Sequence, residues 1–304
     1  MAPGSQDNVL RCYRHPDRET GVSCSECGRG ICPDCMTFGP VGIRCPDHSG
    51  KAQGARRVVE QVQRRTQRSP GLVTKWLIGI NVGIFLLQLA QGAPLTGNGG
   101  SIYENGMLVV QTFGTDGQLI GLYEGEWWRL LTSAFLHYGP IHLAMNMYSL
   151  WLIGQLLEQA LGPARYLAVY LVSGLSGAAG ALWIGSRSEL FDPSPGTPTV
   201  GASGAIFGIL GAAIVLERQR TYVLGGSAVT LLALNLAFTF AVPFISIGGH
   251  VGGLAGGALC VLLLSQFGRR SAVYAKHDVM SYASIAAVAV LSFLVAYLKV
   301  RGYG

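Results

Sequence analysis

Four polar side chains stand in otherwise apolar stretches of the sequence, and together they could hydrolyse a peptide bond. Such a reaction needs a hydroxyl nucleophile, a base that takes its proton, and donors for the oxyanion that develops. Ser203 can supply the hydroxyl and His250 the base. His142 and Asn146 are spaced i, i+4, so both project from one helix face and can supply the donors. No spare acidic residue lies near the same helix ends, so the pattern predicts a Ser–His dyad rather than a triad.

Each of these residues also has an ordinary structural explanation when it is taken alone. A lone histidine in a membrane often lines a pore or is a buried hydrogen-bond partner, and a helical serine often bonds the carbonyl four residues earlier. Polar groups inside a membrane span are nevertheless costly, which makes each one a candidate functional site. The agreement in spacing and depth among the four residues favours catalysis.

The composition predicts the kind of structure that must position them. Hydrophobic residues make up 50% of the 304 residues and charged residues only 12%, about half the roughly 25% of an ordinary soluble domain. Residues 1–69 hold 18 of the 38 charged side chains. These counts exclude a disordered chain, a collagen-like chain and a soluble enzyme. They predict an all-α, polytopic membrane protein preceded by a small polar head.

Seven stretches are long enough for transmembrane helices, each of which needs about 20 apolar residues. We place them near residues 72–91, 142–161, 165–184, 200–216, 222–242, 247–266 and 280–298. Glu124, Glu126 and Arg129 interrupt the apolar residues before the second span, so we expect 92–141 to be a long, partly membrane-embedded loop. Movement of the fifth helix (222–242) and of the loop 242–247 is our hypothesis for how a substrate gains access.

The distribution of Lys and Arg predicts the orientation. Basic residues cluster just before the first span, which places the amino terminus in the cytoplasm. If successive spans cross the membrane in alternating directions, twelve of the basic residues from Arg56 onward lie on the cytoplasmic side and four on the outer side. We therefore expect a multi-pass protein of the cell membrane, with the carboxyl terminus outside if all seven spans cross. Because most of the basic excess flanks membrane spans, the net charge of +6 does not indicate a nucleic-acid partner.

Ser203 is expected at a shallow depth below the outer surface. The first cytoplasmic charge, Glu217, follows it by 14 residues, which is about 21 Å of helix against a hydrocarbon core of about 30 Å. Rows of small residues flank the dyad and would let helices approach closely in lipid, although plain helix packing is an alternative explanation for them. The rows are Gly204 and Gly208 after Ser203, Gly249, Gly253 and Gly257 beside His250, and Gly248, Gly252 and Gly256 next to those.

These residues carry a resemblance to a known family. Gly201-Ala202-Ser203-Gly204 is similar to the GxSG nucleophile motif of the rhomboid intramembrane serine proteases, and the segment 249–253 resembles their catalytic-histidine helix. Residues 137–146, HYGPIHLAMN, resemble the HxxxxHxxxN segment of the family, and Trp128-Arg129 resembles its WR motif. The resemblance covers about residues 70–270.

The resemblance implies a rhomboid-like core of six helices plus one, with Ser203 as nucleophile and His250 as general base. It also implies that His142, Asn146 and the Ser203 backbone N–H form the oxyanion hole.

Three further residues receive supporting roles from the same resemblance. Phe207 stands where the family often has a tyrosine that stacks on the catalytic histidine, so we expect stacking without the phenol hydrogen bond. His137 and Arg129 belong to the matching motifs, and we expect His137 to brace the loop.

The amino-terminal head carries six of the seven cysteines and has the pattern of a metal-binding segment. Four Cys/His pairs share identical two-residue gaps: Cys12-x2-His15, Cys24-x2-Cys27, Cys32-x2-Cys35 and Cys45-x2-His48. Eight such ligands are enough for two tetrahedral, structural zinc sites. Disulfides or a redox CxxC are the alternative, which a reducing cytoplasm and the two histidines disfavour. A segment of about 40 residues with few large apolar side chains would not fold without the metal.

The head resembles a B-box-type zinc finger, and this resemblance implies a cross-braced pairing. One zinc ion would be held by Cys12, His15, Cys32 and Cys35, and the other by Cys24, Cys27, Cys45 and His48. The head lies across the membrane from Ser203, so we expect it to bind a cytoplasmic protein partner rather than to join the chemistry. No cofactor is expected for catalysis.

The predicted organisation has four parts. They are a zinc-binding domain over 1–50, a basic linker over 51–71, a rhomboid core over 72–270, and a seventh helix with a tail over 271–304. The linker could lie on anionic lipid headgroups or serve only as a positive-inside anchor.

The predicted function is an intramembrane serine endopeptidase that cleaves transmembrane segments of membrane proteins near the outer face. One alternative is a catalytically silent rhomboid-like protein that binds membrane clients, which would not need Ser203 and His250. Another is a transporter or channel with a zinc sensor, which would need paired charges in its spans.

Overall fold

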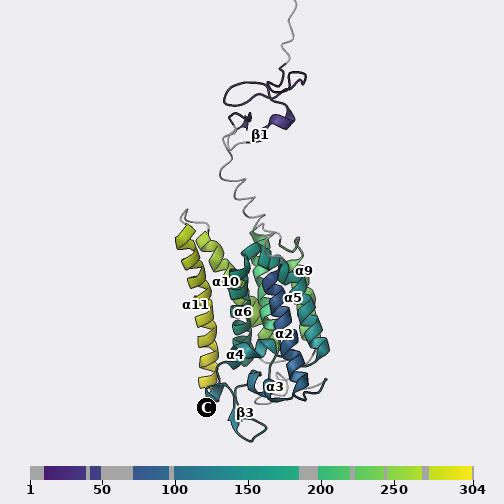
Figure 1. Cartoon of the computed structure of the whole chain (residues 1–304). Helices are drawn as coiled ribbons and strands as arrows, with labels where there is room; N and C mark the ends of the chain where they lie inside the picture. The colour runs from purple at the N-terminus through teal and green to yellow at the C-terminus, as the bar shows by residue number, and fades with distance from the viewer. Residues whose placement is uncertain are drawn as a thin grey trace, which may run out of the picture. The chain divides into compact units, whose positions relative to one another are not determined.

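The computed structural model divides into two compact units, Met1–Gln67 and Arg68–Gly304. The structure describes residues 10–38, 42–48, 71–95, 99–184, 198–219, 223–242, 245–268 and 274–302. The predicted basic linker therefore lies almost entirely outside the described residues. Figure 1 shows the helices and strands of the two units.

The amino-terminal unit contains little regular structure in its described part. A short 3-10 helix, η1 (Pro33–Cys35), precedes strand β1 (Thr37–Phe38), which pairs antiparallel with β2 (Ile43–Arg44). Five buried cysteines and Ile31 form its core. So small an apolar core indicates that the unit depends on something other than hydrophobic burial for stability.

The second unit is a bundle of long helices, and each of the seven predicted spans corresponds to one of them. The helices are α2 (Leu72–Ala90), α5 (Pro140–Leu161), α6 (Pro163–Trp183), α8 (Ser203–Arg218), α9 (Ala228–Ala241), α10 (Ile247–Gly268) and α11 (Tyr274–Arg301). Among the described residues, four helices are long and apolar enough to cross a membrane, namely α2, α6, α10 and α11. The polytopic all-α fold and the multi-pass membrane character are thus confirmed.

Two of the spans begin later than predicted, for local reasons. The fourth begins at Ser203 rather than at 200, because Gly201 has φ +128°, which interrupts the helical backbone. The fifth begins at Ala228 rather than at 222. The preceding turn is held by the Glu217 carboxylate, which accepts the backbone N–H groups of Leu224, Gly226 and Ala228 at 3.0, 3.0 and 3.3 Å.

Helices α6, α8 and α10 pack closely together, and the predicted glycine rows lie in their contacts. A Cβ added to Gly253 of α10 would lie 2.7 Å from the carbonyl carbon of Gly204 in α8. On the other side of α10, a Cβ added to Gly180 of α6 would lie 3.0 Å from the Cα of Gly252. No side chain larger than hydrogen fits at these positions without a shift of the helices, so the rows bring three backbones together.

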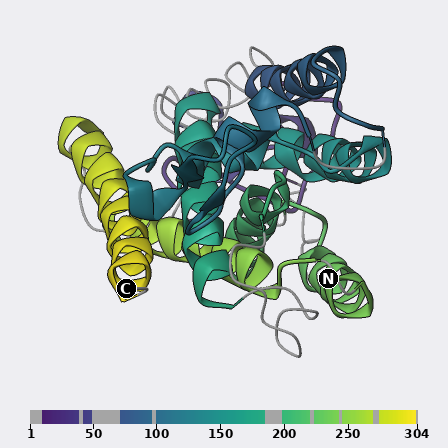
Figure 2. The same cartoon turned by 90° about the horizontal axis from the view of Figure 1, so that it is seen from below.

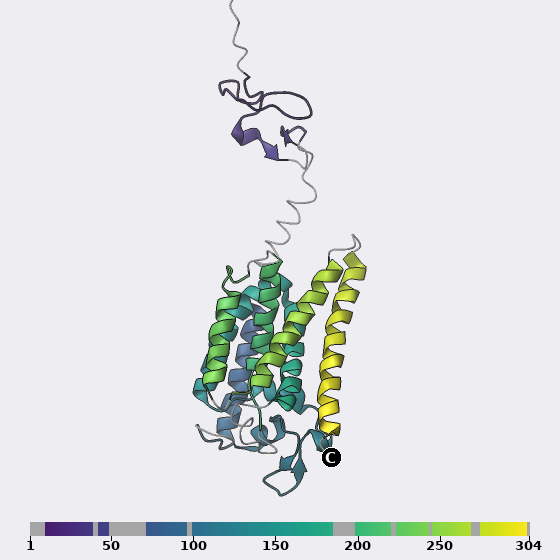
Figure 3. The same cartoon turned by 180° about the vertical axis from the view of Figure 1, so that it is seen from behind.

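Helix α11 stands at the edge of the bundle, on the opposite side from α2 (Figure 2). It packs along α6 and α10 (Figure 3). The Trp183 indole N–H of α6 donates to the Val295 carbonyl at 3.0 Å, and Ser176 and Ser292 are hydrogen-bonded at 2.7 Å. Its carboxyl end lies at the same end of the bundle as α3 and β3 (Figure 1).

The long segment before α5 contains several short elements. They are α3 (Ser101–Gly106), the antiparallel pair β3 (Thr112–Phe113) and β4 (Leu119–Ile120), η2 (Leu122–Glu124), α4 (Arg129–Thr132) and η3 (Ser133–Phe135). Trp127 packs its ring 5.3 Å from that of Phe293 in α11, which anchors the segment to the bundle. Leu108 and Thr199 exchange backbone hydrogen bonds, so the segment also holds the chain just before α8.

Candidate active site

The sharp turn at Gly201 sets Ser203 at the amino end of α8. The Gly201 backbone N–H donates to the Ser133 carbonyl at 2.9 Å, which fixes the turn against η3. Ser203 is the first residue of α8 and remains partly exposed. The first backbone N–H groups of a helix have no partner within the helix, so they are free to bind an anion beside Ser203.

His250 lies in the first turn of α10 at the level of Ser203 in the neighbouring helix. Its ring stacks on Phe207, one turn after Ser203, with a centroid distance of 4.0 Å and an interplanar angle of 16°. The backbones touch beside them, since a Cβ added to Gly204 would lie 3.2 Å from the Gly249 carbonyl oxygen. No hydrogen bond joins Ser203 and His250 among the described residues. Catalytic hydrogen bonds often tighten only when substrate binds.

His142 and Asn146, both on α5, bring two donors to the Gly201 turn. The Tyr138 backbone N–H donates to His142 Nδ1 at 3.4 Å, so in the neutral ring the proton is on Nε2. A Cβ added to Gly201 would lie 2.9 Å from His142 Nε2 and 3.7 Å from Asn146 Nδ2. Asn146 Nδ2 is buried and has no partner among the described residues. The two N–H groups therefore converge beside the amino end of α8, where an oxyanion could accept both.

His137 lies behind His142 and does not reach the Gly201 turn through any described contact. Its ring centroid is 5.1 Å from that of His142, and its side chain is only 1% exposed. Its backbone N–H donates to the buried Gln88 of α2 at 3.4 Å. These contacts tie the start of α5 to α2.

Arg129 is fully buried and organises the segment before α5. It forms an ion pair with Glu126 at 2.7 Å and donates to the carbonyls of Glu104 and Met107 at 2.6 and 3.0 Å. All its described polar partners belong to that segment, which continues through η3 to the Ser133 carbonyl at the Gly201 turn.

Sequence reasoning missed two polar residues in the helices. Thr239 of α9 lies 2.7 Å from His250 Nδ1, measured from its Oγ1. Glu158 of α5 accepts the backbone N–H groups of Val73 and Thr74 at 3.1 and 2.9 Å and so caps the start of α2. The sequence shows Thr239 in one apolar span and Glu158 near the end of another. Neither position indicates which residue the side chain contacts.

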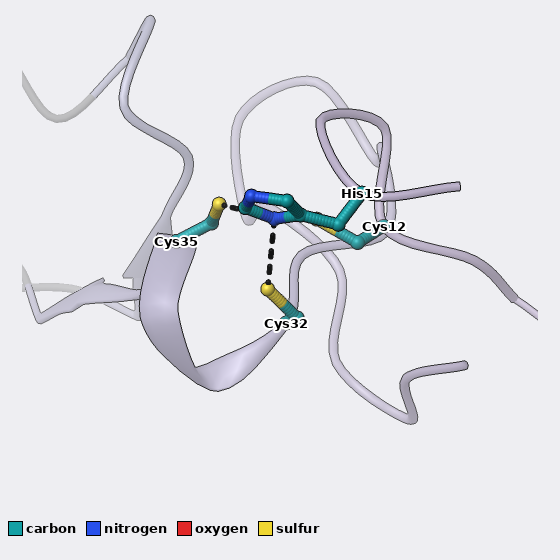
Figure 4. A group of neighbouring side chains, drawn as sticks. All are labelled: Cys12, His15, Cys32 and Cys35. Atoms are coloured by element: carbon teal, nitrogen blue, oxygen red, sulfur yellow. Dashed lines mark hydrogen bonds between the residues drawn. The ribbon is translucent and has the colours of Figure 1, made fainter. Parts of the chain in front are cut away.

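The described part of the amino-terminal unit contains two clusters that could hold metal ions. One is Cys12, His15, Cys32 and Cys35, and the other is Cys24, Cys27, Cys45 and His48. In the first, His15 Nδ1 lies 3.3 Å from Cys32 Sγ and 3.4 Å from Cys35 Sγ (Figure 4). In the second, Cys45 Sγ lies 3.2 Å from His48 Nδ1 and 3.8 Å from Cys27 Sγ.

These spacings fit the donor set of a tetrahedral zinc ion, with Zn–S of about 2.3 Å and Zn–N of about 2.0 Å. All six cysteines of the head are free thiols. Burial and hydrogen bonding to Cys32 and Cys12 raise the pKa of the Cys35 thiol to about 11. In the same cluster, burial is outweighed by hydrogen bonds, which lower the pKa of the Cys12 thiol to about 6. Thiolates packed this closely repel one another, so a cluster of them needs a cation among them.

The second unit of the chain is similar in sequence to proteins of one family. Residues 124–267 match the family model described as "Rhomboid domain". The chain is 39% identical over 156 residues to "Rhomboid protease GluP" of Bacillus subtilis (strain 168), covering 48% of this chain and 29% of that protein. It is 38% identical over 154 residues to "Putative rhomboid protease YdcA" of the same organism, covering 49% and 73%. It is 30% identical over 208 residues to "Rhomboid protease AarA" of Providencia stuartii, covering 62% and 70%.

Proposed function

This chain belongs to the rhomboid family, and we propose that it is an intramembrane serine endopeptidase. Relatives named as rhomboid proteases support a proteolytic activity. The observation that carries the proposal is the convergence of His142 Nε2 and Asn146 Nδ2 on the Gly201 turn, two residues before Ser203. Two N–H donors that converge on one point beside a hydroxyl are the arrangement that an oxyanion hole needs.

In this mechanism Ser203 Oγ attacks the scissile carbonyl while His250 Nε2 takes its proton. The carbonyl oxygen becomes an oxyanion that accepts hydrogen bonds from His142, Asn146 and the Ser203 backbone N–H. His250 then gives the proton to the leaving amine, and an acyl-enzyme remains on Ser203. Water then attacks the ester carbonyl while His250 takes its proton. The ester C–O bond breaks, the carboxylic acid product leaves, and His250 returns the proton to Ser203 Oγ. No step requires a metal or an organic cofactor.

Three residues support this reaction without taking part in bond making. Phe207 holds the His250 ring by stacking. Arg129 orders the segment that supports the Gly201 turn, and His137 packs behind His142.

The proposed substrates are transmembrane segments of other membrane proteins, cut near the outer face of the bilayer. A transmembrane helix satisfies its backbone hydrogen bonds internally, so it must unwind locally before Ser203 can reach a carbonyl. Substrates with small or helix-breaking residues near the outer interface are therefore expected. We also propose that the amino terminus is cytoplasmic, as the distribution of basic residues favours.

For the head we propose a B-box-like zinc-binding domain over 1–50 that holds two structural zinc ions. The two clusters pair the ligands as the cross-braced arrangement requires, which supports the proposal. A linker over 51–71 would join it to the core over 72–270, with the seventh helix and tail over 271–304. A cytoplasmic protein is the proposed partner of the zinc-binding domain.

A fluorophosphonate probe tests the proposed nucleophile. We expect the probe to form one adduct on Ser203 in wild-type protein, located by mass spectrometry, and no adduct in Ser203→Ala or His250→Ala. A wild type that is not labelled under conditions where it remains folded would favour the alternative of a catalytically silent, client-binding protein.

A further inference from the structure

Thr239 makes two short contacts at once, one within its own helix and one with the proposed base. Its Oγ1 lies 2.7 Å from the Asn235 carbonyl oxygen, four residues earlier in α9, and 2.7 Å from His250 Nδ1 in α10. The side chain is fully buried. Both distances are within the ordinary range of a hydrogen bond.

The number of available hydrogens fixes the direction of the two hydrogen bonds of Thr239. A hydroxyl has one hydrogen, and the Asn235 carbonyl can only accept, so the Thr239 O–H must point at Asn235. The hydrogen between Thr239 and His250 must then come from Nδ1, with the Thr239 oxygen accepting it. With the proton on Nδ1, Nε2 of the neutral ring keeps its lone pair. Nε2 is therefore the nitrogen that can take the proton of Ser203 when His250 acts as general base.

Helix α9 otherwise presents little buried surface. Its buried residues are Ala228, at its start, and Thr239, near its opposite end. The neighbours Phe238 and Phe240 are 44% and 49% exposed. Among the described residues of α9, Thr239 is therefore a fully buried side chain near the far end that contacts α10.

We propose that Thr239 is a positioning residue that holds His250 in the Nδ1–H tautomer and aims Nε2 at Ser203. The proposal rests on the proposed protease function. Thr239 orients the imidazole as the acid of a catalytic triad does, with a neutral hydroxyl in place of a carboxylate. Because Thr239 belongs to α9, a displacement of the end of this helix would break the contact between Thr239 and His250. His250 is therefore fully oriented only while the end of α9 is packed against α10.

The test compares Thr239→Val, which removes the hydroxyl at constant shape, with Thr239→Ser, which keeps it. Thr230→Val is the matched control, because Thr230 is an exposed threonine on the same helix. Cleavage of a single-pass reporter is measured in liposomes. We expect Thr239→Val to lower kcat about tenfold with KM unchanged, and Thr239→Ser and Thr230→Val to stay within about twofold of wild type.

The second measurement is nitrogen-15 NMR of histidine-labelled protein in detergent, which reads the tautomer directly and needs no activity. The His250 signals are assigned by their loss in His250→Gln. We expect wild type and Thr239→Ser to have a protonated Nδ1, and Thr239→Val to show a mixture of tautomers.

Three results would overturn the proposal: wild-type His250 protonated on Nε2, Thr239→Val with wild-type kcat, or Thr239→Ser as impaired as Thr239→Val. A wild type that cleaves nothing would overturn the protease function instead, and the NMR comparison would still decide the role of Thr239. If Thr239→Val does not fold, the wild-type spectrum and the Thr239→Ser rate decide.

Discussion

The ring of Phe207 lies almost parallel to that of His250, at a centroid distance of 4.0 Å. Phe207 is one helical turn from Ser203, so the stack sets the height of the proposed base against the proposed nucleophile. The two helices can approach this closely because glycines line their contact.

Removing the ring at position 207 should slow catalysis more than it disturbs the fold. An aromatic pair is worth about 0.5–1.5 kcal/mol beyond its buried area. We therefore expect Phe207→Leu, which keeps most of the volume, to lower kcat by about two- to tenfold. Phe207→Tyr keeps the stack and should retain activity. Rates are measured on the same reporter in liposomes, with melting temperatures to show that both variants are folded. Equal rates for Phe207→Leu and wild type would argue against a role for the stacking of Phe207 on His250.

The oxyanion donors should matter for the rate rather than for binding. Loss of one oxyanion-hole donor lowers kcat by about 10²–10³-fold in the serine protease subtilisin. We expect this range for Asn146→Ala and for His142→Ala, with KM changed by less than about threefold because both donors act on the developing charge. Steady-state kinetics separate the two constants. A large rise in KM at constant kcat would instead assign these residues to substrate binding.

The packing of α8 on α10 should tolerate no added methyl group. Gly253→Ala would set a Cβ 2.7 Å from the carbonyl carbon of Gly204. Overpacking of this kind costs about 1–3 kcal/mol, so we expect a lower melting temperature together with reduced cleavage. Gly83→Ala is the control, since a Cβ added at this position of α2 meets no atom within 4 Å. If Gly253→Ala melts like Gly83→Ala, the close approach of the two helices is wrong.

The zinc content of the head should follow the two clusters. We expect two zinc ions per chain by elemental analysis of purified protein, and one ion each in Cys12→Ser and Cys24→Ser, because these cysteines belong to different clusters. The double variant should bind none. Cys260→Ser is the control, because Cys260 lies in α10. A single substitution that removes both ions would show that the two sites fold only together, and a wild type without zinc would contradict the assignment.

Much of this arrangement could be predicted because it depends on local patterns. Apolar stretches predicted the seven helices, and identical Cys/His gaps predicted ligand pairs that the structure gathers into two clusters. The contact of Thr239 with His250 could not be predicted, because it depends on how α9 rotates against α10. The cap on α2 by Glu158 was missed for a similar reason, since a carboxylate near a helix end could equally face water. The start of α8 also differs from the predicted start, because the positive φ of Gly201 interrupts the helix.

The decisive measurement is cleavage of a single-pass reporter in liposomes by wild type, Ser203→Ala and His250→Ala. We expect wild type to cut the reporter and both variants to be inactive although folded, with a product of the size of a cut near the outer face. Cleavage by the Ser203→Ala variant at the wild-type rate would contradict the role of Ser203 as nucleophile.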